Sequence, residues 1–142
     1  MIGMDILQPV VVLLAWTMVM WLWMYATRIP AMLKAGIDAK GMVGSTGASL
    51  RAQLPEHVSW KADNYNHLHE APTLFYAVAI VLAVIGQGEG FNTTLAWAYV
   101  GLRIAHSILQ ATINKVAIRF ALFALSSIAL MALILHAGIA VF

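Results

Sequence analysis

Long apolar runs alternate with short polar segments along the chain, and their lengths predict four membrane-spanning helices. The first run, from Ile6 to Thr27, contains 22 residues and no charge. At 1.5 Å per residue, a helix of this length crosses a hydrocarbon core of about 30 Å. The links after the second and third runs are short, so spans two to four should be antiparallel neighbours. The predicted spans are about 6–28, 60–86, 93–114 and 117–141.

The connection between the first two spans, about residues 29–59, has no sustained periodicity and is rich in glycine. A connection of this length often carries function, and we expect it to be partly ordered. Most basic residues lie at this end of the spans, namely Arg28, Lys34, Lys40, Arg51, Lys61, Lys115 and Arg119. The positive-inside rule therefore predicts a cytoplasmic loop and both termini on the non-cytoplasmic side.

Composition supports a membrane protein, because 62% of the residues are hydrophobic and only 10% are charged. Soluble domains contain about 25% charged residues. The chain has no cysteine, which excludes disulfides, thiolate metal sites and a cysteine nucleophile, so any thiol must come from a substrate. The net charge is only +2, and the basic residues are not interleaved with aromatic ones, so we expect no nucleic-acid binding. The predicted fold is an all-α, multi-pass integral membrane protein with one domain, residues 1–142.

Polar residues recur every three or four positions on spans two and three, so each set shares one helix face. The two sets are Asp63, Asn66 or His67, and Glu70 on span two, and Arg103, His106, Gln110 and Asn114 on span three. A charged side chain near the membrane centre costs about 2.5 to 3.5 kcal/mol, so such residues usually face a bundle interior or a wet cavity. We therefore predict a polar cavity between these helices that opens toward the cytoplasm.

Depth along the helices predicts an ion pair at the closed end of this cavity. Counted from the inner ends, Glu70 lies roughly 15 Å into span two and Arg103 roughly 16 Å into span three. The two charges are opposite and at the same level, so we expect them to pair. Lys115 and Arg119 should lie at the mouth.

Two other interpretations of these polar residues are open. Buried polar side chains often only hold helices together, at roughly 0.6 kcal/mol per hydrogen bond, so the pair of Glu70 with Arg103 also fits a structural role. A metal or haem site of His67, Glu70 and His106 would suit iron. The sequence has no Glu-x-x-His pair, and we expect no metal.

Two stretches of the chain resemble the MAPEG family, the membrane-associated proteins of eicosanoid and glutathione metabolism. The segment "NHLHEAPTLFYA" is similar to the family's Asn-x-x-Glu followed by proline and phenylalanine. The segment "GLRIAHSILQATINKVAIRFALFAL" resembles the family stretch that runs from an arginine and a histidine to a catalytic arginine. The resemblance covers nearly the whole chain. It implies a four-transmembrane-helix bundle that assembles as a homotrimer, with glutathione held between subunits.

Carried over residue by residue, the resemblance implies that Arg119 is catalytic and stabilises the thiolate of glutathione, the co-substrate. The positions implied to bind glutathione are Asn66, His67, Glu70, Arg103, His106, Gln110 and Lys115. A nearby guanidinium favours the thiolate, because it lowers the thiol pKa from about 8.5. The implied activity is a transferase or peroxidase acting on a small hydrophobic electrophile that arrives from the lipid bilayer.

The chain departs from the family pattern at three positions. Phe123 stands where several family enzymes have a tyrosine, and Phe120 stands where they have a serine. Asn66 precedes Glu70 by four residues rather than three, which leaves His67 in the asparagine position. The missing hydroxyl groups motivate an alternative function, a non-catalytic scaffold or accessory subunit of a larger membrane assembly. The chain also ends without a retrieval signal, which favours a bacterial inner membrane.

Overall fold

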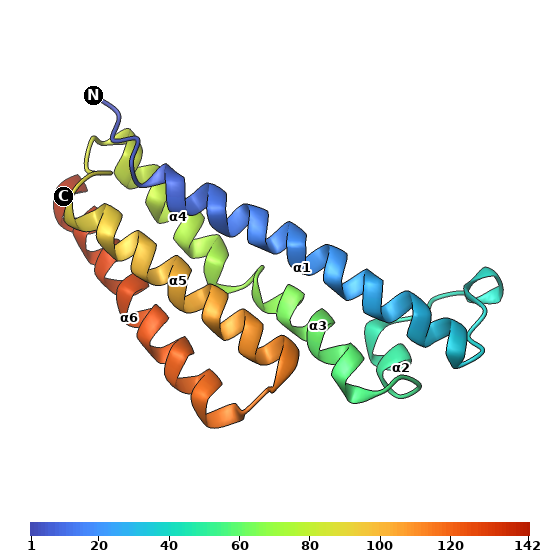
Figure 1. The fold of residues 1–142 in the computed structure, drawn as a ribbon. Coiled ribbons are helices and arrows are strands. Elements are labelled where there is room, and N and C mark those ends of the chain that lie inside the picture. The colour runs from blue at the N-terminus through green and yellow to red at the C-terminus, as the bar shows by residue number, and fades with distance from the viewer.

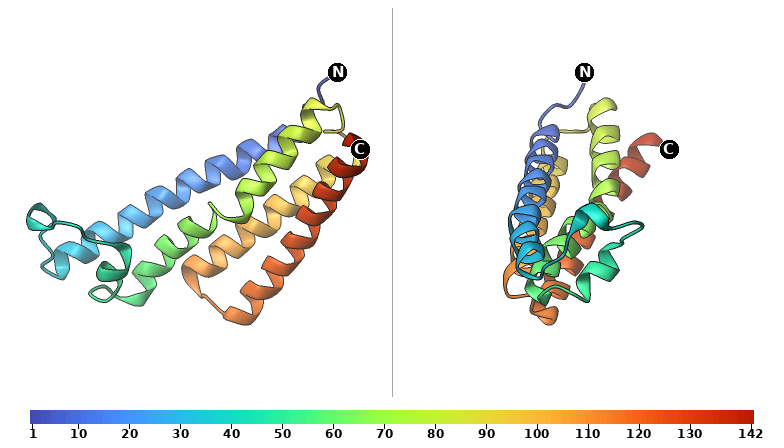
Figure 2. Two further views of the ribbon diagram at one scale, coloured as in Figure 1. Left: turned by 180° about the vertical axis from the view of Figure 1, so that it is seen from behind. Right: turned by 90° about the vertical axis from the view of Figure 1, so that its right-hand side faces the viewer.

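The computed structural model describes all 142 residues and contains helices but no strand (Figure 1). The long helices run alongside one another in the order of the chain: α1, then α3 continued by α4, then α5 and α6 (Figure 1). Both termini lie at one end of the bundle (Figures 1 and 2). We call this the terminal end, and the opposite end the loop end. The elements are α1 (Leu7–Lys34), the 3₁₀ helix η1 (Ala39–Gly41), α2 (Gly47–Arg51), α3 (Glu56–His67), α4 (Ala71–Val84), α5 (Phe91–Thr112) and α6 (Val116–Val141).

Three segments are long and apolar enough to cross a membrane: α1, the broken segment Glu56–Val84, and α6. Helix α5 has 22 residues and is about 33 Å long, but polar side chains lower its mean hydropathy. These side chains, such as Arg103 and His106, are buried in the bundle rather than exposed to lipid. The outer surface instead presents large apolar side chains. The protein is therefore an all-α membrane bundle.

The connection between α1 and α3 is shorter than the sequence indicated. Helix α1 continues to Lys34, and α3 begins at Glu56, so residues 35–55 form the loop. Within it, Thr46 caps α2 through a capping box, in which its side chain accepts from Ser49 N and its own N–H donates to Ser49 Oγ. Such reciprocal bonds satisfy N–H groups that a helix start leaves free. The loop therefore has local order although few of its residues are buried.

The second span is not one continuous helix, because it breaks between α3 and α4. Pro72 lies in the first turn of α4, and proline has no N–H with which to bond the carbonyl four residues earlier. Glu70 has φ −94° and ψ −103°, outside the helical region. Its carbonyl accepts instead from Thr73 N at 3.0 Å and Thr73 Oγ1 at 2.6 Å. Non-helical backbone at membrane depth is tolerated where it is buried in protein or lines a cavity.

Helix α5 is the centre of the bundle and contacts α1, α3 and α6. Its Ser107 Oγ accepts hydrogen bonds from Trp16 Nε1 on α1, at 2.9 Å, and from Asn64 Nδ2 on α3. Closer to the terminal end, Tyr99 stacks on Phe75 of α4 with ring centroids 4.5 Å apart. A shared hydroxyl and an aromatic stack therefore fix the second span against α5 on both sides of the break.

The first residues of the chain are held against the link between α4 and α5. Gly3 N donates to Ala83 O, and Ile6 N donates to Gly88 O, both at 2.9 Å. The backbones of Gly3 and Gly88 pass so closely that a Cβ on either residue would overlap the backbone of the other. Glycine is therefore needed at this contact because it has no side chain.

Replacing Gly88 by alanine should detach this N-terminal segment. The added methyl group cannot fit against Gly3, and forced overpacking typically costs about 1 to 3 kcal/mol. Faster hydrogen exchange at Gly3 and Ile6, with a lower unfolding temperature, would show the loss. Gly41→Ala is the matched control, because a Cβ there meets no atom within 4 Å. Unchanged exchange in Gly88→Ala would contradict the close contact.

Candidate functional site

The polar stripe of α5 is buried against the neighbouring helices, as its spacing predicts. Arg103 is 2% exposed and His106 is 3% exposed, and Gln110 is equally buried. They are three and four residues apart, so they lie along one face of the helix. Since α5 contacts α3 and α6, this face supplies one wall of the candidate site.

The predicted ion pair between Glu70 and Arg103 is wrong. Arg103 Nη2 donates instead to the backbone carbonyl of His67, at 3.3 Å. The helix break turns the chain before Glu70, so this residue does not continue the face of α3, and its side chain is exposed. The single ion pair of the chain joins Arg51 to Asp63. Arg103 therefore stabilises the end of α3, whereas the Glu70 carboxylate is available to a ligand.

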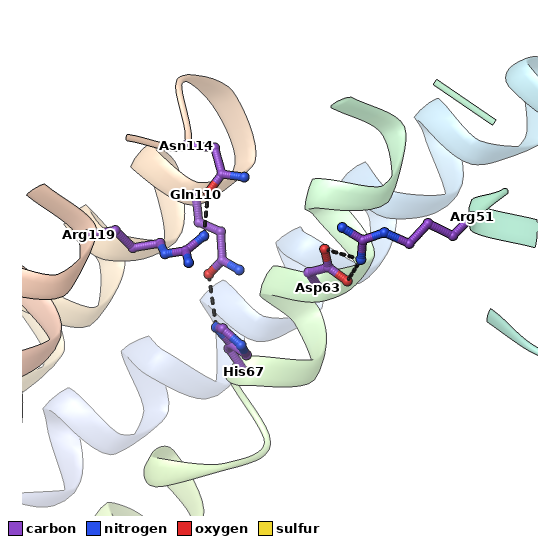
Figure 3. Close-up of polar contacts among 6 residues, drawn as sticks. All are labelled: Arg51, Asp63, His67, Gln110, Asn114 and Arg119. Carbon is purple, nitrogen blue, oxygen red and sulfur yellow. Dashed lines mark hydrogen bonds and ion pairs between the residues drawn. The ribbon is translucent and has the colours of Figure 1, made fainter. Parts of the chain in front are cut away.

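His67 joins α3 to α5 in the inner part of the site. Its Nδ1 lies 3.1 Å from Gln110 Oε1 and donates to it (Figure 3). The His106 ring lies 6.3 Å from the His67 ring, centroid to centroid, and its buried Nδ1 has no hydrogen-bond partner. Asn66 is exposed. Of the two alternatives for the family's asparagine position, His67 is thus the inward one.

Arg119 enters the site from the first turn of α6. Asn114 lies just after the C-cap of α5 and has φ +52°, a left-handed conformation that asparagine tolerates beyond helix ends. Its Oδ1 then accepts from Arg119 Nη1 (Figure 3). Val116, Phe120 and Phe123 follow the same face at helical spacing. The tight turn between α5 and α6 therefore fixes the direction of the guanidinium.

Two adjoining cavities surround these side chains. The deep cavity has a volume of about 220 Å³ and is lined by His67, Glu70, Ala71, Arg103, His106, Val116, Arg119, Phe120 and Phe123. The polar cavity has a volume of about 480 Å³ and is lined by Arg51, Asp63, Asn66, His67, Glu70, Gln110, Asn114, Val116 and Arg119. His67, Glu70, Val116 and Arg119 belong to both. A ligand in the polar cavity would meet one in the deep cavity beside these four residues.

Seven of the eight predicted site residues line one or both cavities, and Lys115 does not. Asn66 and Gln110 line the polar cavity but not the deep one. Lys115 is the exposed residue before α6, and its backbone carbonyl accepts from Arg119 N at 3.0 Å. It precedes Arg119 by four residues, but its side chain lines neither cavity.

Arg51 is a wall residue of the polar cavity that the sequence did not identify. Its Nη1 donates to both carboxylate oxygens of Asp63, at 2.8 and 3.0 Å (Figure 3). Arg51 ends α2 in the loop, and Asp63 lies on α3. A lone basic residue in an irregular loop gives no periodic signal, so only the structure places it at this cavity.

The chemistry of these walls suits a polar ligand that carries both signs of charge. Glu70 can accept from an ammonium group, and Arg51 and Arg119 can donate to carboxylates or to a thiolate. No group of three or more His, Asp or Glu side chains lies close enough together to hold a metal ion. The polar cavity therefore matches a zwitterionic molecule, and the deep cavity adds the apolar surfaces of Phe120 and Phe123.

Comparison with known proteins shows the family of the chain. The sequence profile of the MAPEG family matches residues 6–139, nearly the whole chain. No curated protein and no solved structure gives a significant match. The chain therefore belongs to the MAPEG family.

Proposed function

We propose that the protein is a glutathione-dependent membrane transferase or peroxidase that acts on a small hydrophobic electrophile. The observation that carries the proposal is the place of Arg119, which lines both the polar and the deep cavity. A thiolate beside its guanidinium would lie where a polar co-substrate meets an apolar one. The MAPEG family includes glutathione transferases and peroxidases as well as non-catalytic members, so membership alone does not decide the activity.

Glutathione would occupy the polar cavity. The Glu70 carboxylate is free of any ion pair and would accept from the ammonium group of the tripeptide. His67, with Gln110 behind it, would orient the peptide, and Asn66 lies at the rim. Arg119 would stabilise the thiolate, because a neighbouring cation favours the charged form of a thiol. Arg103 and His106 line the deep cavity and would lie beside the end of glutathione that is nearest to that cavity.

The hydrophobic substrate would reach the deep cavity from the bilayer. Phe120 is 68% exposed and Phe123 is 44% exposed, and both also line this cavity. Their rings thus extend from the outer face of α6 to the site. At the two positions where family enzymes have hydroxyl groups, this chain offers an apolar surface, which supports an apolar second substrate.

The assembly and orientation are part of the proposal. We expect a homotrimer, in which a second copy covers the exposed side of Glu70. We also expect the loop end to face the cytoplasm, because the basic residues gather there. Scattering measurements on the purified protein give the subunit number, and accessibility labelling of Lys40 from each side of the membrane gives the orientation.

Binding of glutathione should raise the thermal stability of the purified protein. At a hundredfold excess over Kd, a ligand that binds only the folded state adds about 2.7 kcal/mol. The experiment measures unfolding with and without millimolar glutathione, together with conjugation of a simple aryl halide. Glu70→Gln is the matched variant, because it removes the charge without breaking an ion pair of the fold. It should keep its stability without ligand and lose most of the shift.

The same experiment separates the alternative function, a non-catalytic scaffold or accessory subunit. Phe120 and Phe123 support this alternative, because neither can donate a hydrogen bond to a thiolate. A protein with no glutathione shift, no conjugation and stoichiometric membrane partners would be a scaffold. A shift that Glu70→Gln removes, with turnover of the halide, would identify the enzyme.

A further inference from the structure

A third cavity, which we call the interfacial cavity, lies at the loop end between α1, α2 and α3. Its volume is about 540 Å³, larger than either cavity of the candidate site. It shares Arg51, Asp63 and Asn66 with the polar cavity. Its lining residues are Met24, Arg28, Gly47, Ala48, Arg51, Ser59, Ala62, Asp63, Tyr65 and Asn66.

Two lining residues have buried polar atoms without a partner. Arg28 forms no ion pair and no side-chain hydrogen bond within the chain, and its Nε is buried. Ser59 is 3% exposed, and its Oγ is also buried and unpaired. Buried polar groups in folded proteins are nearly always hydrogen-bonded, so unpaired groups facing a cavity indicate an absent ligand or ion.

The charges of the lining side chains indicate that this ligand is an anion. Arg51 neutralises Asp63, and both of its bonds come from Nη1, so its Nε–H and Nη2–H groups remain free to donate. The Arg28 charge is uncompensated. Two guanidinium groups and a hydroxyl therefore surround a space with surplus positive charge. Guanidinium forks match the oxygens of phosphate and carboxylate groups.

The position in the bundle indicates the source of the anion. Arg28 lies six residues before the end of α1 at Lys34, about 9 Å along the helix. The same stretch presents Trp21, Tyr25 and Ile29 outward as exposed side chains. Aromatic residues of this kind mark the level of lipid headgroups, and basic pockets between helices at that level bind anionic headgroups.

We infer that the interfacial cavity binds the phosphate group of an anionic phospholipid. Arg28 and Arg51 donate to the phosphate oxygens, and Ser59 adds its hydroxyl hydrogen bond. The acyl chains lie against the outer side of α1 at Tyr25 and Ile29. The lipid site does not require the proposed function, but it shares Arg51 with the polar cavity. Arg28 and Ser59 line neither cavity of the candidate site, so substitutions of these two residues test the lipid site separately.

The test measures lipid binding by the purified protein in the absence of glutathione. Phosphatidylglycerol and phosphatidylcholine are titrated separately, with native mass spectrometry and thermal unfolding as the two measurements. We expect phosphatidylglycerol to bind at least tenfold more tightly, and Arg28→Gln to remove that preference. Arg28→Lys should keep part of it, and Ser59→Ala should weaken it. Lys34→Gln is the matched control, because it removes a cation from the same helix outside the cavity.

Three outcomes decide the inference. Equal binding of the two lipids, or an unchanged preference in both Arg28→Gln and Ser59→Ala, would overturn it. Stabilisation by inorganic phosphate that depends on Arg28, without a lipid preference, would keep the phosphate site and assign it to a soluble phosphate compound. Loss of glutathione binding in Arg28→Gln, with lipid binding unchanged, would overturn the lipid site and join this cavity to the thiol site.

Discussion

Replacing Arg119 by alanine should lower kcat/KM for glutathione conjugation by about a hundredfold or more. Removing one donor that stabilises charge in a water-poor site typically costs a factor of 10² to 10³. Arg119 is the only arginine that lines both the polar and the deep cavity, because Arg103 lines only the deep one and Arg51 only the polar one. The ultraviolet absorbance of bound thiolate should fall in parallel, since the guanidinium no longer favours the charged thiol.

Two further variants test whether the effect depends on the positive charge of Arg119, on the shape of its guanidinium group, or on loss of any surface cation. Arg119→Lys keeps the charge but loses the planar fork, so it should recover part of the thiolate signal and less of the turnover. Lys40→Ala removes an exposed cation from η1, outside both cavities, and should leave turnover unchanged. Full activity in Arg119→Ala, with an unchanged unfolding temperature, would contradict the catalytic role of Arg119.

The helices and the burial of the α5 stripe could be predicted because each depends on a local rule. Apolar run length is set by bilayer thickness, and a polar side chain in such a run must face away from lipid. Arg103, His106 and Gln110 therefore had one favourable direction, and the structure places them there. His67 and Glu70 also line cavities with them.

The ion pair between Glu70 and Arg103 was a wrong prediction because it assumed an unbroken helix. Depth and face were both counted along one ideal helix, whereas Pro72 interrupts the hydrogen bonds just after Glu70. The signal was present in the sequence, since proline usually ends or kinks a helix at the residues before it. At the break, the His67 carbonyl accepts from Glu70 N at 3.2 Å and also from Arg103 Nη2, and Glu70 is exposed.

Contacts from the loop could not be predicted from the sequence. Arg51 reaches Asp63 because the loop brings the end of α2 close to α3, and no periodic pattern encodes the path of an irregular loop. The side-chain direction of Lys115 could not be predicted either. Lys115 lies in the turn between α5 and α6, where a shift of one residue changes the direction of a side chain. Its side chain is exposed although Arg119, one helical turn later, faces the site.

Replacing Phe75 by alanine should destabilise the bundle more than any other truncation considered for this chain. Phe75 is fully buried and stacks on Tyr99 at 4.5 Å. Truncating a buried phenylalanine costs about 3 to 5 kcal/mol, because the surrounding side chains cannot fill the space. The stack holds α4 to α5 on the terminal side of the helix break, where proline has already removed a backbone hydrogen bond. Loss of the ring should therefore loosen the wall that carries Glu70.

Unfolding in detergent, followed by circular dichroism, measures this loss against a matched neighbour. Leu74→Ala removes an adjacent side chain that is 57% exposed on the outer face of α4, so it should change stability by less than about 0.5 kcal/mol. Phe75→Leu keeps most of the volume and should cost under about 1.5 kcal/mol. If Phe75→Ala and Leu74→Ala were equally mild, α4 would not be fixed by this stack, and the position of Glu70 would depend on the break alone.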